Sequence, residues 1–193
     1  DDVAEIDGRP LAGKELARIV ALLDLVRTQA GLKLRASVSS RTDFPKAAGL
    51  ASSAAGGAAL AAAASWAAGL APATKDLSIL ARRNSGSACR SVEGGFCEWR
   101  RGSAQDGSDS YAVQVADEAF WPSLRMVVVV CSGAEKLVSS RDAMRHTVET
   151  SPYYPAWAEC AERDLSEARA ALLAKDLDGL GADTYRFMCD VGD

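Results

Sequence analysis

Apolar residues recur with a helical period along most of the chain. Residues 11–28 carry leucine, isoleucine and valine on one stripe, and Gly31 follows as a stop signal. An alanine-rich stretch to about Ala68 predicts a second helix, and Thr74 is placed to cap a third. Later in the chain the same period predicts helices over 139–150, 155–174 and 177–188.

Strand patterns are interleaved with the first helices. Apolar and polar residues alternate over 32–38, which predicts a half-buried strand. The strongest strand signal is the apolar run 124–131, which we expect to be buried on both faces. Shorter strands are expected at 3–6, 96–99 and 111–115. Because strands and helices come first and helices dominate later, we predict an α+β fold.

The composition is that of an ordinary globular protein. The chain has 193 residues, of which 48% are hydrophobic and 25% charged, enough for one large domain or two small ones. Its net charge of −4 argues against a nucleic-acid partner, since neutralising phosphates requires clustered basic residues. Residues 47–74 carry no charge, but they are mostly small, so we expect a buried helix and no membrane contact.

The cysteines do not form a recognisable ligand or disulfide pattern. They lie at positions 89, 97, 131, 160 and 189, and His146 is the single histidine. We therefore expect no protein metal site and no disulfide framework. Reduced thiols in an intracellular compartment are the expected state.

Small residues and hydroxyls crowd the start of the alanine-rich helix, around Gly49, Ser52 and Ser53. Free backbone N–H groups and the helix dipole attract phosphate at such a position. The Gly-Lys-Ser/Thr ending of a Walker A loop is missing. An alanine-rich packing helix with a serine cap explains the same residues, so both interpretations stay open.

A second polar stretch is Ser85-Gly-Ser-Ala-Cys-Arg-Ser91. It is too small and polar to be core, and its hydroxyls and arginine suit a ligand with more than one anionic group. The alternatives are a helix junction broken by glycine, or a serine or cysteine nucleophile that uses His146 as its base. A third stretch begins at Ser139, which either caps the next helix together with Asp142 or faces a ligand.

These stretches resemble known motifs. Pro45-x-x-x-Gly49-Leu50-x-Ser52-Ser53-Ala54 resembles the phosphate-binding motif of the GHMP small-molecule kinases. Three longer motifs resemble one branch of that superfamily, the diphosphomevalonate decarboxylases: Ala47-Ala-Gly-Leu-Ala-Ser-Ser-Ala-Ala-Gly56, Ser85-Gly-Ser-Ala-Cys-Arg-Ser91 with Gly94-Gly-Phe-x-Glu-Trp99, and Thr147-Val-Glu-Thr-Ser-Pro152. The resemblance runs through nearly the whole chain but covers only a central part of the family's length.

The resemblance implies a GHMP-kinase fold with two domains. Residues 1–122 would form an S5-like N-terminal domain that binds the ATP phosphates, and 123–193 would begin a ferredoxin-like α/β C-terminal domain. It also implies a homodimer in the cytoplasm.

The implied reaction belongs to the mevalonate pathway of isoprenoid and sterol biosynthesis. Mg-ATP phosphorylates the 3-hydroxyl of mevalonate 5-diphosphate, and loss of phosphate and CO2 then gives isopentenyl diphosphate. The alternatives are a mevalonate monophosphate decarboxylase, a small-molecule kinase that stops at phosphorylation, or a binding domain without catalysis.

The resemblance also assigns site residues. Those for the ATP phosphates, with Mg²⁺ as the accompanying ion, are Ala48, Gly49, Leu50, Ala51, Ser52 and Ser53. Those for mevalonate 5-diphosphate are Ser85, Gly86, Ser87, Ala88, Cys89, Arg90, Ser140 and Arg141. Arg90 would grip the carboxylate, Ser85 and Ser87 would hold the diphosphate, and Arg90 and Ser52 would be the catalytic residues.

The sequence departs from the family pattern at several places. Thr42-Asp43 replaces Asn-Asn, Asn84 replaces Gly, and Arg141 replaces a substrate-contacting Thr. The family's substrate-binding Tyr and Lys and its Asp-Ala-Gly-Pro-Asn segment find no match, and none of the late aspartates, Asp183, Asp190 and Asp193, fits that segment. We therefore expect the 193 residues alone to lack full activity.

Overall fold

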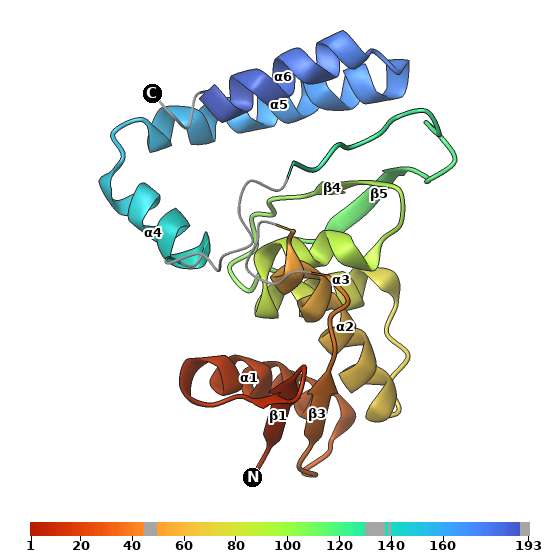
Figure 1. The fold of residues 1–193 in the computed structure, drawn as a ribbon, viewed down its shortest axis with the longest axis vertical. Helices are drawn as coiled ribbons and strands as arrows, with labels where there is room; N and C mark the ends of the chain where they lie inside the picture. The colour runs from red at the N-terminus through yellow and green to blue at the C-terminus, as the bar shows by residue number, and fades with distance from the viewer. Residues whose placement is uncertain (45–49, 130–137, 139, 190–193) are drawn as a thin grey trace. The chain divides into compact units, whose positions relative to one another are not determined.

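The computed structural model describes residues 1–44, 50–129, 138 and 140–189, with side chains as far as residue 184 (Figure 1). It divides into two units, 1–135 and 136–193, and each is described by itself. The elements of the first unit are β1 (Val3–Ile6), β2 (Arg9–Pro10), α1 (Gly13–Ala30), β3 (Ser37–Ser40), α2 (Ser52–Ala67), α3 (Thr74–Asn84), the 3-10 helix η1 (Gly86–Val92), β4 (Phe96–Trp99) and β5 (Ala112–Ala116). Those of the second unit are α4 (Ser140–Thr150), α5 (Tyr154–Ala174) and α6 (Leu177–Cys189).

The first sheet has the strand order β2-β1-β3. β1 and β3 are parallel with Val3 opposite Ser37, and α1 forms the connection between them. As predicted, α1 ends at Gly31, which adopts the left-handed conformation with φ 65°. The strand expected over 32–38 is wrong in its first half, because pairing with β1 begins only at Ser37 and Leu34 is 72% exposed.

A buried acid fastens α1 to this sheet. The Asp2 side chain accepts a hydrogen bond from the Ala36 backbone N–H at 2.8 Å and is paired with the Arg27 guanidinium. The backbone hydrogen bond, together with the arginine charge, holds the Asp2 pKa below its ordinary value against the opposing effect of burial. Asp2 therefore stays ionised, and the start of β1 remains tied to α1.

The core of the first unit lies among α1, α2, α3 and η1. Its buried residues are Leu22, Val26, Ala58, Ala61, Leu80, Ala81 and Ala88. The alanine-rich helix predicted up to Ala68 is confirmed as α2, and its small side chains let the neighbouring elements approach closely. Thr74 is the first residue of α3 and does not cap it; the N-cap is Ala73, without a side-chain hydrogen bond. In the described part of the chain, no helix is both long and apolar enough to cross a membrane.

The second sheet contains β4 and β5, paired antiparallel with Trp99 opposite Ala112. Both strands were predicted to within one residue of their observed bounds. The pairing places the end of β4 and the start of β5 next to α3 and η1, so this hairpin supports the candidate site described below.

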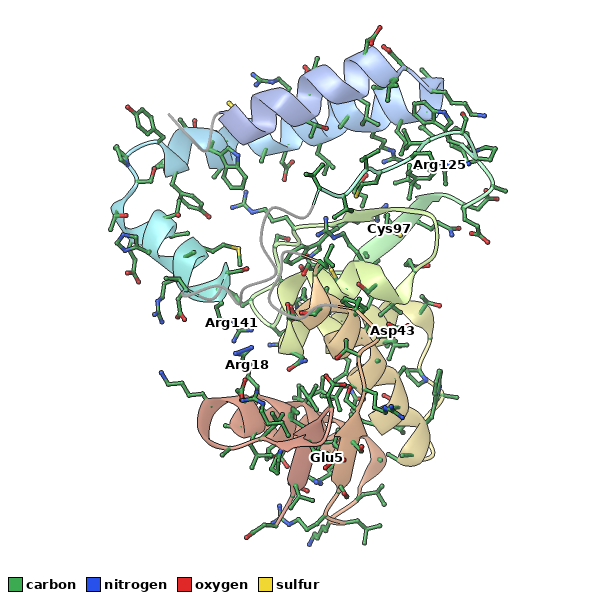
Figure 2. The ribbon with its side chains drawn as sticks, in the orientation of Figure 1. Glu5, Arg18, Asp43, Cys97, Arg125 and Arg141 are labelled. Carbon is green, nitrogen blue, oxygen red and sulfur yellow. The ribbon has the colours of Figure 1, made fainter. Side chains whose placement is uncertain are left out.

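The strand predicted over 124–131 is wrong where the structure describes it. Residues 124–129 adopt no strand, and Met126 and Val127 are 91% and 83% exposed. The Arg125 side chain (Figure 2) donates instead to the carbonyl oxygens of Pro122 and Leu124. A strand buried on both faces needs partner strands along its edges, and no described strand pairs with these residues. Residues 130 and 131 lie outside the described part.

The three helices predicted for the second unit are confirmed to within two residues. α5 and α6 pack side by side (Figure 1), and α5 has a proline in its first turn, where the missing N–H costs no hydrogen bond. With only the described residues around it, every residue of α4 is exposed or half-buried. The cap expected from Ser139 falls on a residue outside the described part.

Candidate functional site

The N-terminus of α2 presents free hydrogen-bond donors. Its N-cap residue Ala51 has φ 54°, none of the described side chains caps the helix, and no acidic residue lies in its first turn. Ser52 is half-buried and Ser53 is exposed, and within the described residues neither hydroxyl forms a hydrogen bond. The Ala54 N–H donates to the Ala51 carbonyl at 2.8 Å, which leaves the N–H groups of Ser52 and Ser53 without a partner in the described part, at the positive end of the helix dipole. This end of α2 therefore suits an anionic group such as phosphate.

Only part of the predicted phosphate-binding segment can be placed. Leu50, half-buried, precedes Ala51, and Ser52 opens the helix. The predicted residues Ala48 and Gly49 lie outside the described part. The assignments of these residues to ATP stay predictions.

The second predicted binding segment forms η1, which starts directly after Ser85. Ser85 and Ser87 are half-buried, and neither hydroxyl forms a hydrogen bond in the described part of the chain. Arg90 is exposed, and its guanidinium makes no hydrogen bond or ion pair within the described residues. One hydroxyl directly before this short helix, a second hydroxyl within it and a planar cation are thus available together, as a ligand with two separate anionic groups requires.

The interpretation that this whole segment is too polar for the core is wrong for Ala88 and Cys89. Both side chains are 0% exposed, so these residues can reach a ligand only through their backbone. Burial raises the pKa of the Cys89 thiol, while the charge of Arg90 opposes the rise. A buried, protonated thiol is a poor nucleophile, which argues against cysteine catalysis here.

Close packing joins α2 to η1. Gly57 faces η1, and a β-carbon built on it would lie 3.0 Å from Ala88 Cβ and 3.1 Å from Asn84 Nδ2. Its neighbour Gly56 has no atom within 4 Å of the corresponding position. Gly57 follows Ser52 by only about 7.5 Å along the helix axis. The two predicted binding segments therefore approach each other closely at Gly57, where an added side chain would require its neighbours to shift by a few tenths of an ångström.

Trp99 supports η1 from the side of β4. A β-carbon on Gly86 would lie 2.9 Å from Cη2 of the Trp99 indole, so position 86 has no room for a side chain unless the ring moves. The indole Nε1 donates to Ser110 Oγ at 3.1 Å, and Arg82 Nε donates to the Ser110 carbonyl at 2.9 Å. The sequence motifs include Trp99 and end directly before Gly57, and they give neither residue a role, because the partners of both are distant in sequence.

The remaining predicted substrate residues belong to the second unit. Ser140 and Arg141 open α4, and both are exposed. Figure 2 labels Arg141. Asp142 pairs with Arg145 at 3.1 Å one turn along the helix. The predicted contacts of Ser140 and Arg141 with substrate stay predictions.

A separate hollow of about 460 Å³ lies beside the ends of β1 and β3. Several of its polar groups are paired with one another: Asp7 accepts from the backbone and hydroxyl of Thr42, and Ser39 donates to Glu5. None of its lining residues belongs to the predicted binding segments. Among the described residues, no group of three or more His, Cys, Asp or Glu side chains is arranged to hold a metal ion.

Comparison with known proteins assigns both parts of the chain to one kind of enzyme. The family model "Diphosphomevalonate decarboxylase-like N-terminal domain" matches residues 1–112, and "Mevalonate 5-diphosphate decarboxylase C-terminal domain" matches 126–188. Human diphosphomevalonate decarboxylase is 52% identical over 121 residues, which cover 63% of this chain and 30% of the human protein.

Solved structures agree with these matches. The mevalonate diphosphate decarboxylase of Staphylococcus aureus superposes with a TM-score of 0.89 at 41% identity, covering 99% of this chain and 57% of that one. A protein abbreviated MDDEF, in complex with MVAPP, AMPPCP and magnesium, gives a TM-score of 0.88 at 42% identity, covering 99% and 58%. The predicted α+β class and GHMP-kinase fold are thereby confirmed. The chain spans less than two thirds of the length of each of these relatives.

Proposed function

Because the chain belongs to the diphosphomevalonate decarboxylase family, we propose that it carries the phosphate-binding and substrate-binding segments for ATP-dependent decarboxylation of mevalonate 5-diphosphate to isopentenyl diphosphate. One observation carries this proposal. Arg90 is exposed and unpaired within the described residues, on the same short helix as the free hydroxyl of Ser87. A carboxylate and a diphosphate on one substrate match a guanidinium and nearby hydroxyls.

The start of α2 fits the phosphates of ATP. The N–H groups and the hydroxyls of Ser52 and Ser53 are donors with no protein acceptor in the described part, and no first-turn acid opposes an anion. Bound Mg-ATP supplies the phosphoryl group that turns the tertiary 3-hydroxyl of the substrate into a leaving group. The related complex with AMPPCP and magnesium supports this assignment. We assign no protein ligand to Mg²⁺.

Arg90 and the serines of this segment orient the substrate. The guanidinium forks onto the substrate carboxylate, and Ser85 and Ser87 donate to the diphosphate. Fixing both ends aligns the bond between the carboxylate carbon and its neighbour with the departing phosphate. As phosphate leaves C3, the electrons of that carbon–carbon bond form the new double bond and CO2 departs. Arg90 and Ser52 are the catalytic residues in this account.

Three further features complete the proposal. The protein acts in the mevalonate pathway that leads to isoprenoids and sterols, in the cytoplasm, as a homodimer. The boundary between its two domains lies at 122/123, a position between the two matched regions. Ser140 and Arg141 contact the substrate from the second domain.

The length of the phosphate chain on the substrate tests the assignment. We expect the complete gene product to prefer mevalonate 5-diphosphate over the 5-monophosphate by about 10- to 100-fold in kcat/KM, because the monophosphate forfeits charged hydrogen bonds of about 1.5–3 kcal/mol each. Steady-state kinetics with both compounds measures the ratio. Equal rates, or a preference for the monophosphate, would contradict the assignment and favour a monophosphate decarboxylase.

A further inference from the structure

The Ser78 hydroxyl joins three elements at one buried point. Ser78 lies on α3 and is 0% exposed. Its Oγ donates to the carbonyl oxygen of Cys89 in η1 at 2.9 Å and accepts from the backbone N–H of Ala112 in β5 at 2.9 Å. Both backbone partners belong to residues that are at most 1% exposed, so water cannot replace the hydroxyl without a rearrangement.

This contact acts on the residue that the proposed function needs most. The Cys89 carbonyl belongs to the planar peptide unit that joins Cys89 to Arg90, so holding its oxygen fixes the direction in which the Arg90 side chain leaves the backbone. Within the described residues, no other hydrogen bond ties η1 to a strand or to another helix. The Arg90 guanidinium has no hydrogen-bond partner there that could orient it.

The 3-10 conformation makes such support necessary. η1 runs over seven residues, whereas 3-10 helices longer than three or four residues are uncommon because their hydrogen bonds are poorly aligned. Packing holds the start of η1, where Trp99 lies against Gly86 and Gly57 lies against Ala88. In the described part of the chain, the bond from the Ser78 hydroxyl is the only hydrogen bond that reaches the Cys89–Arg90 peptide unit from outside η1.

We propose that Ser78 is a positioning residue, which acts through the Cys89 carbonyl to hold Arg90 in the orientation that binds the substrate carboxylate. This inference rests on the proposed function. The Ser78 side chain is covered by protein and does not touch substrate, so its effect should pass through Arg90 and leave the phosphate-binding end of α2 unchanged.

Ser78→Ala in the complete gene product tests the proposal. We expect kcat/KM for mevalonate 5-diphosphate to fall about 10- to 100-fold, the range for leaving a buried polar group unpaired, while KM for ATP changes less than threefold. Ser78→Cys keeps a weak donor of similar size and should restore part of the loss. Ser65→Ala is the matched control, because Ser65 is equally buried on α2 but its hydroxyl has no hydrogen-bond partner among the described residues.

A double-mutant cycle separates positioning from general destabilisation. If Ser78 acts through Arg90, adding Ser78→Ala to Arg90→Ala should lower kcat/KM by less than threefold further. Independent, multiplicative losses would overturn the proposal, and so would equal losses in the kinetics of ATP and substrate.

Amide hydrogen exchange separates the failure of this inference from the failure of the proposed function. If wild-type protein releases no CO2 from mevalonate 5-diphosphate, the proposed function fails, and the exchange comparison still tests the support of η1. We expect Ser78→Ala to speed exchange at Ala112 and within η1 while α1 stays protected. Unchanged exchange in η1 would overturn the role of Ser78.

Discussion

Arg90→Ala is expected to lower kcat/KM for mevalonate 5-diphosphate by about 10²- to 10³-fold. The guanidinium has no hydrogen bond or ion pair in the described part of the chain, so its loss should leave the fold intact and remove the partner of the substrate carboxylate. Truncating one member of a buried, hydrogen-bonded charge pair costs about 2–5 kcal/mol. Steady-state kinetics measures the loss, and urea unfolding should give the wild-type midpoint.

Two variants control this experiment. Arg90→Lys keeps the charge without the planar fork, so it should recover only part of the activity. Arg101→Ala removes another exposed arginine that has no hydrogen bond within the described residues and belongs to neither predicted binding segment, and it should stay within twofold of wild type. Near-normal turnover by Arg90→Ala would remove Arg90 from the mechanism.

Gly57→Ala is expected to weaken the binding of ATP and of mevalonate 5-diphosphate at the same time. The added methyl group would lie 3.0 Å from Ala88 Cβ and 3.1 Å from Asn84 Nδ2, so η1 and the Asn84 side chain must give way by a few tenths of an ångström. Overpacking of this kind costs about 1–3 kcal/mol of the free energy of unfolding. Because the contact links the phosphate-binding and substrate-binding segments, kcat should fall and KM should rise for ATP and for mevalonate 5-diphosphate alike.

Gly56→Ala is the matched control for this substitution. The two glycines are adjacent in α2, but the methyl group of the control would meet no atom within 4 Å. Replacing glycine by alanine inside a helix then stabilises the protein by about 1 kcal/mol. Urea unfolding should give a lower free energy of unfolding than wild type for Gly57→Ala and a higher one for Gly56→Ala. Equal stability and equal activity of the two variants would contradict this account.

The sequence predicted the elements that carry their own periodic signal. The helices α1, α2, α5 and α6 follow from the spacing of their apolar residues or from a long run of alanines. Gly31 marks the end of α1, because the left-handed conformation there favours glycine. The local sequence pattern is sufficient to predict a helix, because the spacing of its apolar residues follows from helix geometry alone.

The sequence was less informative about strands, because a strand forms only where a neighbouring strand pairs with it. The alternation around Leu34 resembles a strand, yet β3 begins only where β1 offers a partner, at Ser37. Residues 124–129 read as a buried strand, yet none of the described strands pairs with them. A strand exists through its neighbours, and local pattern does not show which neighbours are present.

In the candidate site too, the sequence indicated the functional groups but not the distant contacts that hold them in place. Composition and motif located the hydroxyls of Ser52 and Ser87 and the cation of Arg90. The contacts that hold them are made by Gly57, which has no functional side chain, and by Ser78, which lies outside the motifs. Both contacts join segments that are distant in sequence. The sequence alone does not distinguish Ser78 from a small residue that merely fits into the core, because its two backbone hydrogen-bond partners are known only from the structure.

The most direct test of the central claim is a count of two products. The complete gene product is supplied with Mg-ATP and mevalonate 5-diphosphate labelled in the carboxyl group, and labelled CO2 and ADP are measured together. We predict CO2 release that depends on ATP and matches ADP mole for mole, and that is lost in Arg90→Ala. ADP without labelled CO2 would identify a kinase that stops at phosphorylation, and neither product would contradict the assigned substrate.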